Sequence, residues 1–296
     1  MHVVIGGASG FLGTALVAHL RGEGHEVTRL VRTDDPRSDA SLWDPRTGRL
    51  DQIVIDRADA VVNLSGSSVA RWPRTGRVRR ELLASRIDAT TTLARAVAAS
   101  ENHPVLLSQS AMGIYGPDRG DEILTEKSEP GTGFLSEVVQ RWEAATQPAA
   151  DAGARVCRMR TTLPLDRRGG LLQPLVPMFK LGAGARLGSG RQYMTMVSLH
   201  DWLRAVTFLL EHPSASGPFN IGMPKPPTNA EFTDALGKAL NRPTVLVAPT
   251  IALKAVLGGV ADDLLGSLRV ESAALRDAGF MFDHADVESA LKPALA

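Results

Sequence analysis

Three glycines near the start of the chain have the spacing of a nucleotide-binding turn. Gly7, Gly10 and Gly13 form a G-x-x-G-x-x-G pattern between a β-rich run and the helical run Phe11–Gly22. Such a turn lets the backbone approach a pyrophosphate closely, and the helix that follows presents free N–H groups and its positive dipole end to the phosphates. The loop Gly6–Gly13 is therefore predicted to bind a dinucleotide, with a purely structural turn as the alternative.

The residue after the second β-rich run indicates which dinucleotide is bound. The run Glu26–Val31 is followed directly by Arg32. An acidic residue at this place accepts a hydrogen bond from the ribose 2′-hydroxyl of NAD, whereas an arginine suits the 2′-phosphate of NADP. Arg32 favours NADP(H) as the cofactor. NAD(H) is the alternative, because Asp34 and Asp35 follow closely.

An alternation of strands and helices is needed to position these residues. Short β-rich runs and longer runs with helical periodicity alternate through the first half of the chain. This pattern predicts βαβ units, and hence an α/β fold with a Rossmann-type doubly wound parallel sheet and a smaller, discontinuous C-terminal lobe. The expected strands are 2–5, 26–31, 60–64, 105–108 and 156–160, and the expected helices are 11–22, 77–99 and 134–152.

The alternation of short strands and longer helices changes after Thr161. We predict a nucleotide-binding domain over 1–162, with 198–224 returning to it, and a substrate lobe built from 163–197 and 225–296. Further helices are expected at 198–212 with Ser198 as N-cap, at 228–240 with a Thr228–Glu231 capping box, and at 285–291 near the end. The polar loop 118–133 is long enough to suggest a functional flap.

Several motifs outside the glycine loop give the chain a family resemblance. They are Asn63-Leu64-Ser65-Gly66, Ser108-Gln109-Ser110 with Tyr115-Gly116, Thr125-Glu126, Gly188–Gln192, Leu199-His200-Asp201, Gly217–Asn220 and Ala274–Phe280. With these residues the chain resembles the extended short-chain dehydrogenase/reductase superfamily, also called the NAD-dependent epimerase/dehydratase family. More narrowly, it resembles a subgroup of epimerase family proteins with a C-terminal domain of unknown function.

The resemblance implies a set of cofactor-binding positions. Arg86 stands where the family often has an asparagine, and Leu163 with Pro164 is expected to wall the nicotinamide. The full set that we expect to contact the cofactor is Gly7, Ser9, Gly10, Phe11, Leu12, Gly13, Arg32, Asn63, Leu64, Ser65, Gly66, Arg86, Ser108, Leu163 and Pro164.

Two departures from the family pattern bear on the chemistry. The family's proton-transferring Tyr and its Lys, four residues apart, fall at about Leu135 and Val139, which cannot titrate. Ser110 and Tyr115 are the remaining catalytic candidates, although Tyr115 can instead pack under the loop 118–133. The arginine that grips the diphosphate in nucleotide-sugar members is replaced by Met194, and a thioether does not bind phosphate.

These observations favour an NADP(H)-binding oxidoreductase of atypical mechanism, acting on a small carbonyl or alcohol that the sequence does not identify. A catalytically silent NADP(H)-binding redox sensor or scaffold is the alternative, which the missing Tyr and Lys support directly. A nucleotide-sugar epimerase is the third possibility and the least favoured one.

Composition limits the partners. The 296 residues carry a net charge of +1, so no nucleic acid or membrane partner is expected, and the arginines between Arg71 and Arg80 are read as a solvated helix face. Cys157 is the single cysteine, so we expect no disulfide and no cysteine-based metal site, and the chain offers no other metal site that we expect. A cytoplasmic location is expected, because the first strand begins at His2 and no apolar run approaches membrane-spanning length. The polar helices 77–99 and 134–152 leave a monomer and a homodimer both open.

Overall fold

The computed structural model describes residues 1–69, 73–257 and 260–296, so Arg71 lies outside the described residues. The chain divides into two compact units. Unit 1 comprises Met1–Ser110, Val138–Met159 and Val206–Pro218, and unit 2 comprises Ala111–Glu137, Arg160–Ala205 and Phe219–Ala296. These units are defined by packing, whereas the domains expected from the sequence are defined by function, so the functional division at residue 162 stays a prediction.

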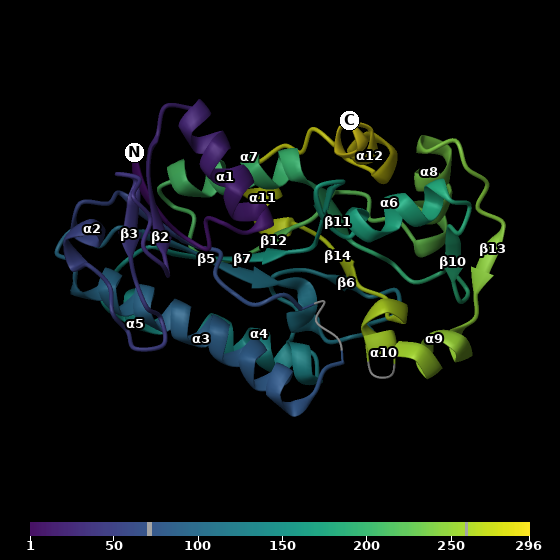
Figure 1. Ribbon diagram of the computed structural model, residues 1–296, viewed down its shortest axis with the longest axis horizontal. Helices are drawn as coiled ribbons and strands as arrows, with labels where there is room; N and C mark the ends of the chain where they lie inside the picture. The colour runs from purple at the N-terminus through teal and green to yellow at the C-terminus, as the bar shows by residue number, and fades with distance from the viewer. Residues whose placement is uncertain (70–72, 258–259) are drawn as a thin grey trace. The chain divides into compact units, whose positions relative to one another are not determined.

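A seven-stranded sheet is the central feature of the fold (Figure 1). Its strand order is β12-β7-β5-β4-β1-β2-β3. β1 runs parallel to both β2 and β4, so the chain leaves β1 in one direction and returns to its other side. This reversal is the switch point of a doubly wound sheet, and it confirms the predicted Rossmann-type fold. The strands are β1 (His2–Gly6), β2 (Glu26–Val31), β3 (Ala40–Leu42), β4 (Ala60–Asn63), β5 (Val105–Ala111), β7 (Val156–Thr161) and β12 (Gly217–Ile221).

Apolar side chains from strands and helices form the core of unit 1. Val4, Leu93 and Leu106 belong to this core and are fully buried, and burial of such a side chain stabilises a fold by about 1.5–3 kcal/mol. The long helix α3 lies beside α5 in this unit (Figure 1). The helices that begin or end in unit 1 are α1 (Phe11–Gly22), α2 (Gln52–Asp56), α3 (Gly76–Ala99), α4 (Phe134–Ala144), α5 (Gln147–Asp151) and α7 (Leu199–Glu211).

The single helix expected over 134–152 is wrong, because the structure has two. α4 ends at Ala144 and α5 begins at Gln147. Pro148 stands in the first turn of α5, where its missing N–H costs nothing; inside one continuous helix the same proline would remove a hydrogen bond. Thr146 Oγ1 donates to the backbone oxygen of Glu143 at 2.7 Å and stabilises the break.

Unit 2 has its own core and several small sheets. β11 pairs with β8, which pairs with β9, and α12 packs against α8. The core includes Leu165, Phe232 and Leu291. The elements are η1 (Met112–Tyr115), β6 (Ile123–Leu124), β8 (Leu163–Asp166), β9 (Gly169–Gly170), α6 (Leu172–Lys180), β10 (Ala185–Leu187), β11 (Met196–Ser198), α8 (Asn229–Ala239), β13 (Leu246–Ala248), α9 (Thr250–Leu257), α10 (Val260–Leu265), β14 (Arg269–Val270), α11 (Ala273–Asp277) and α12 (Val287–Leu295).

The predicted helix caps in this unit are confirmed. Ser198 Oγ accepts a hydrogen bond from the backbone nitrogen of Asp201 at 3.0 Å, and Thr228 forms the expected capping box with Glu231. The last helix begins later than expected, at Val287, because Asp286 caps it. Among the described helices, none has the length and apolar character that crossing a membrane would require.

The loop 118–133, whose length predicts a functional flap, is anchored to the C-terminal part of the chain, and its function stays a prediction. Its strand β6 pairs in parallel with β14 from the C-terminal part of the chain. Ser267 adds two bonds, since its backbone nitrogen donates to Asp118 Oδ1 at 3.1 Å and its hydroxyl donates to the Gly120 oxygen at 2.6 Å. The loop is therefore a held part of unit 2.

Candidate nucleotide-binding site

Two of the three glycines in the turn are required by the protein's own packing. Gly7 has a φ of +80°, and a Cβ atom added there would lie 2.6 Å from the carbonyl carbon of Leu64. A Cβ added at Gly13 would lie 2.2 Å from the Gly7 oxygen. Both distances are shorter than a van der Waals contact, so β1, the turn and α1 can pack this closely only with glycine.

Gly10 is different. Its φ of −76° suits any residue, and a Cβ added there would meet the Gly7 oxygen at 3.4 Å, an ordinary contact. Gly10 is exposed and is the N-cap of α1, where it offers no side chain to the first turn. The N–H groups of that turn are thus available to a ligand, and the absence of a side chain at residue 10 leaves room for a close approach.

The neighbours of these glycines in the turn remain accessible. Ser9 is exposed, and Phe11 and Leu12 are partly exposed. The turn therefore fits the pyrophosphate of a dinucleotide, while the individual cofactor contacts expected from the sequence stay predictions.

The end of β4 shapes the loop that faces the glycine turn. Asn63 is fully buried, and its Nδ2 donates to Thr90 Oγ1 at 2.8 Å while its Oδ1 accepts from the backbone nitrogen of Ser65 at 3.0 Å. Trp142 Nε1 also donates to Thr90 Oγ1, at 2.9 Å. The backbone nitrogen of Leu64 donates to the Gly6 oxygen at 2.8 Å. Asn63 thus fixes this loop against the glycine turn, and Thr90 and Trp142 are supports that sequence reasoning missed.

Arg32 and the acids after it have distinct environments. Arg32 is exposed and has no hydrogen-bond or ion-pair partner among the described residues. Asp35 is engaged instead, because it accepts from Arg37 Nη2 at 2.7 Å and from Arg29 Nη2 at 3.2 Å. The hydrogen bonds from Arg37 are the main reason that the pKa of Asp35 is well below its usual range. At this strand end two exposed side chains have no partner among the described residues, the cation of Arg32 and the carboxylate of Asp34.

Arg86 lies on α3 and is buried, with 8% of its surface exposed. Its Nη1 donates to the Leu82 oxygen and its Nη2 to the Ser67 oxygen, both at 3.0 Å. The guanidinium carbon lies 5.0 Å from the centroid of the Trp142 ring, which is a cation–π distance. Burial lowers the pKa of Arg86 to about 10, so the side chain is still charged at neutral pH.

The two serines of β5 that were singled out from the sequence are both buried. Ser108 Oγ makes only a long bond, 3.4 Å, to the Gln109 oxygen. Ser110 Oγ donates to Glu143 Oε1 at 2.6 Å, so its proton is turned toward α4. Sequence reasoning did not identify Glu143 as this partner, because the two residues are far apart in the chain.

Tyr115 belongs to unit 2, together with Leu163 and Pro164. It is fully buried, and its Oη lies 2.7 Å from Asn220 Oδ1 and 3.0 Å from the Thr125 oxygen, the two acceptors available to its one proton. Arg160 Nη1 donates to the same Oη at 3.1 Å. Burial raises the pKa of Tyr115, which is the opposite of an activated tyrosine. These contacts match the packing role that the sequence left open, and a catalytic role stays a prediction.

Leu163 and Pro164 are half-buried residues of β8. They are held by parallel pairing with Met196 and Val197 of β11. Their expected contact with the nicotinamide stays a prediction.

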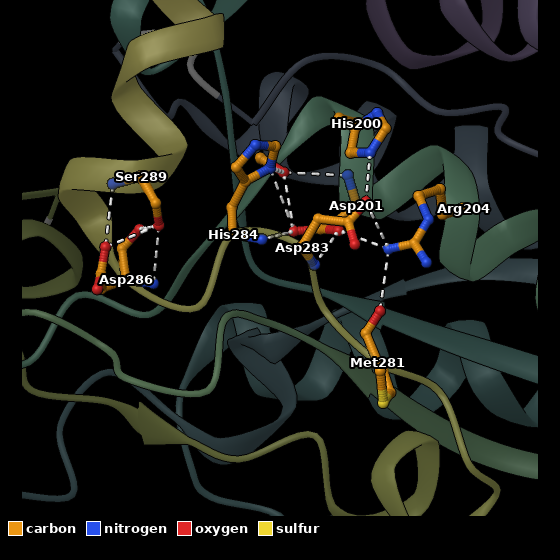
Figure 2. Close-up of polar contacts among 9 residues, drawn as sticks. His200, Asp201, Arg204, Met281, Asp283, His284, Asp286 and Ser289 are labelled. Carbon is orange, nitrogen blue, oxygen red and sulfur yellow. Dashed lines mark hydrogen bonds and ion pairs between the residues drawn. The ribbon is translucent and has the colours of Figure 1, made fainter.

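Within the described chain, His200, Asp201 and Asp283 form the one group of three side chains close enough together to share a metal ion (Figure 2). Arg204 Nη1, however, lies 3.1 Å from an oxygen of each of the two carboxylates. The buried carboxylate of Asp201 also accepts from the backbone nitrogens of Asp283 and His284, each at 2.9 Å. The positive charge between the acids is thus supplied by arginine, and the group holds the turn at 283–284 against α7 (Figure 2).

Comparison with known proteins agrees with this geometry. The model of the NAD dependent epimerase/dehydratase family matches residues 3–222, which include the sheet and the glycine turn. The chain belongs to this family. A second model, described as a domain of unknown function (DUF1731), matches residues 248–294. These matches confirm the resemblance noted from the sequence, including the subgroup with a C-terminal domain of unknown function.

Relatives cover almost the whole chain. Epimerase family protein Mb2239 of Mycobacterium bovis is 44% identical over 290 residues, covering 98% of this chain and 96% of that protein. Epimerase family protein SDR39U1 of Bos taurus is 33% identical, with 100% of both chains covered. The crystal structure of human epimerase family protein SDR39U1 (isoform 2) with NADPH has a TM-score of 0.90 and 30% identity, covering 99% of each chain.

Proposed function

We propose that this protein is an NADP(H)-dependent oxidoreductase of atypical mechanism that acts on a small carbonyl or alcohol. The observation that carries the proposal is the glycine turn of unit 1. Neither the backbone angle nor the packing requires glycine at residue 10. The room that this glycine leaves for a phosphate explains its presence there. The human relative crystallised with NADPH supports the same cofactor.

The choice of NADP(H) over NAD(H) is supported by the end of β2. Arg32 is a free cation there, and Asp35 is already engaged by Arg29 and Arg37. A carboxylate so engaged is a poor acceptor for the ribose 2′-hydroxyl, while an unpaired guanidinium suits a 2′-phosphate.

Different residues of the protein would bind the cofactor and transfer the proton. The first turn of α1 would hold the pyrophosphate, and Arg32 would hold the 2′-phosphate. When bound, the nicotinamide supplies or accepts a hydride. The proton transfer that accompanies it needs a group other than the family's tyrosine, because α4 has Leu135 and Val139 at the corresponding places. Ser110 and Tyr115 stay the proposed candidates.

A catalytically silent redox sensor or scaffold is a second candidate function. A specific observation favours it: the hydroxyl groups of Ser110 and Tyr115 are both used within the protein, on Glu143 and on Asn220. A nucleotide-sugar epimerase is not favoured, since Met194 replaces the expected arginine and its sulfur accepts from Asn229 Nδ2 at 3.2 Å.

Calorimetric titration with NADPH and with NADH tests the cofactor proposal. We expect NADPH to bind more tightly, and the substitution Arg32→Ala to weaken NADPH binding about tenfold, equal to about 1.4 kcal/mol, while NADH binding stays unchanged. Arg95→Ala, which removes an exposed arginine from α3, is the matched control. Equal affinity for the two cofactors, or an equal loss of both in Arg32→Ala, would contradict the proposal.

Turnover separates the two candidate functions. NADPH oxidation is followed by absorbance with a panel of small aldehydes and ketones. Oxidation that depends on one of these substrates supports the oxidoreductase, and tight NADPH binding without any oxidation supports the silent protein.

A further inference from the structure

The most exposed large apolar side chains of the described residues belong to unit 2. Leu181, Ile251 and Val245 have the highest exposed fractions, at 86%, 85% and 83%. Leu246 and Val247, which follow Val245 in β13, are half exposed. A single exposed apolar side chain is normal on a protein surface, whereas a group of them marks a place that binds a partner.

The pairing of β13 places two of these side chains on one face with a cation. β13 pairs in parallel with β10 (Figure 1), and Val247 stands opposite Arg186 in the register. Side chains that stand opposite each other lie on the same face of a sheet, and alternate residues of a strand share a face. Val245, Val247 and Arg186 therefore lie on one face of this two-stranded sheet, and all three are exposed.

The residues on either side of β13 continue this exposed region. Arg242 Nε donates to the Lys180 oxygen at 2.9 Å, so Leu181 lies close to the segment that leads into β13. Ile251 stands in the first turn of α9, which begins at Thr250, directly after the strand. We call the following set the β13 surface: Leu181, Val245, Val247 and Ile251, together with Lys180, Arg186 and Arg242.

The charges of the β13 surface are all positive. Lys180, Arg186 and Arg242 are exposed, and none of them has an acidic partner among the described residues. The sequence has no aspartate or glutamate over 167–200 or over 235–257. The net charge of +1, from which no membrane partner is expected, is an average over the whole chain that this surface does not share.

We propose that the β13 surface docks on an anionic membrane. Peripheral proteins bind such a membrane by placing apolar side chains at the boundary between headgroups and acyl chains, while cations are attracted to the anionic lipids. The β13 surface supplies both kinds of group. Its aliphatic side chains would enter the boundary, and its lysine and arginines would lie at the lipid phosphates.

Two other occupants fit the β13 surface less well. A second copy of this chain, related by a two-fold axis, would bring the same cations together, and like charges across an interface are unfavourable. A peptide that adds a strand to β13 would meet Pro243 and Pro249, which flank the strand and limit backbone pairing to a few residues. A lipid surface needs no backbone pairing and supplies the negative charge.

Co-sedimentation of the full chain with lipid vesicles tests the proposal. Vesicles of phosphatidylcholine alone are compared with vesicles of phosphatidylcholine and phosphatidylglycerol in equal amounts. We expect binding to the anionic vesicles, and we expect added salt to weaken it. The double variant Lys180→Gln with Arg186→Gln should weaken this binding about 25-fold, since each cation near the surface contributes about fivefold. Val245→Ser with Ile251→Ser should weaken it at least about tenfold, because two apolar side chains are lost.

Matched control variants come from unit 1. Ile53→Ser removes an exposed apolar side chain from α2, and Arg95→Gln removes an exposed cation from α3. Both controls should bind the anionic vesicles like the wild type. Thermal unfolding checks that every variant is folded, and substitutions of exposed side chains should change the stability little. None of these residues is assigned to the cofactor, so the test does not depend on NADPH binding.

Three results would overturn the proposal. The first is a wild-type protein that does not bind the anionic vesicles, which would leave the β13 surface to a protein partner. The second is vesicle binding that both double variants retain in full. The third comes from sedimentation velocity: a wild-type dimer that Val245→Ser with Ile251→Ser converts to a monomer would assign the surface to a second copy of the chain.

Discussion

Replacement of Gly10 by alanine separates what the fold needs from what the ligand needs. The added Cβ meets the Gly7 oxygen at 3.4 Å, and the φ of −76° is ordinary for alanine. The expected cost to the fold is therefore limited to the poorer N-cap, about 1 kcal/mol, because alanine caps helices less well than glycine. For a protein of this size, that corresponds to a fall in Tm of about 2 °C.

The expected cost to ligand binding is much larger. The methyl group would stand where the pyrophosphate approaches the first turn of α1, and it would lengthen or break the charge-assisted bonds from the backbone. One such bond contributes about 1.5–3 kcal/mol, so NADPH affinity should fall by about 10- to 150-fold.

Thermal unfolding and calorimetric titration of the same preparations measure the two effects. Gly22→Ala is the matched control, because a Cβ at the far end of α1 meets no atom within 4 Å. That variant should bind NADPH normally and be neutral or slightly stabilised, by at most about 1 kcal/mol. A folded Gly10→Ala protein with wild-type NADPH affinity would refute the reasoning, since the glycine would then serve no ligand.

Further predictions concern unit 2, where Tyr115→Phe should lower the free energy of unfolding by about 1–3 kcal/mol in urea titration, since Asn220 Oδ1 loses its buried donor. Turnover per folded molecule that is unchanged in this variant would remove Tyr115 from the mechanism. Thr228→Ala should cost about 1 kcal/mol in the same assay, through loss of the capping box of α8. In unit 1, burial raises the pKa of the Cys157 thiol to about 11. The unfolded chain therefore loses this proton at lower pH than the native state, so stability should fall as pH rises from the ordinary thiol value toward 11. Thiol reagents at pH 8 should label Cys157 only after unfolding, and rapid labelling of the native protein would contradict its burial.

Much of the nucleotide-binding half could be predicted because its signals are local. The glycine spacing, the apolar strand before it and the bounds of α1 at Phe11–Gly22 all lie within one short stretch of sequence. The capping residues Ser198 and Thr228 were equally predictable, since a cap bonds to backbone only three residues away. Structural requirements that act over one helical turn produce patterns of residue types that can be recognised in the sequence.

Other features depend on contacts between distant residues, which a single sequence does not display. Arg29 donates a hydrogen bond to Asp35, which makes this carboxylate at the end of β2 a poor acceptor for a ribose hydroxyl. The residue types alone do not reveal this hydrogen bond. The bond between Ser110 and Glu143 joins two elements separated by the loop and η1. The strand β6 has only two residues, and no periodicity can reveal a pairing that short.

The pairing of β6 with β14 has a consequence for how the protein is made. Val270 donates through its backbone nitrogen to Thr195, Asn220 donates to the Glu271 oxygen, and the Ser272 hydroxyl bonds to Gly222. A nascent chain on the ribosome can form its glycine turn early, but these bonds must wait until residues 269–272 have emerged. Native contacts of such long sequence separation form slowly, so unit 2 should fold later than the glycine turn, while unpaired groups around β6 are exposed to chaperones and proteases.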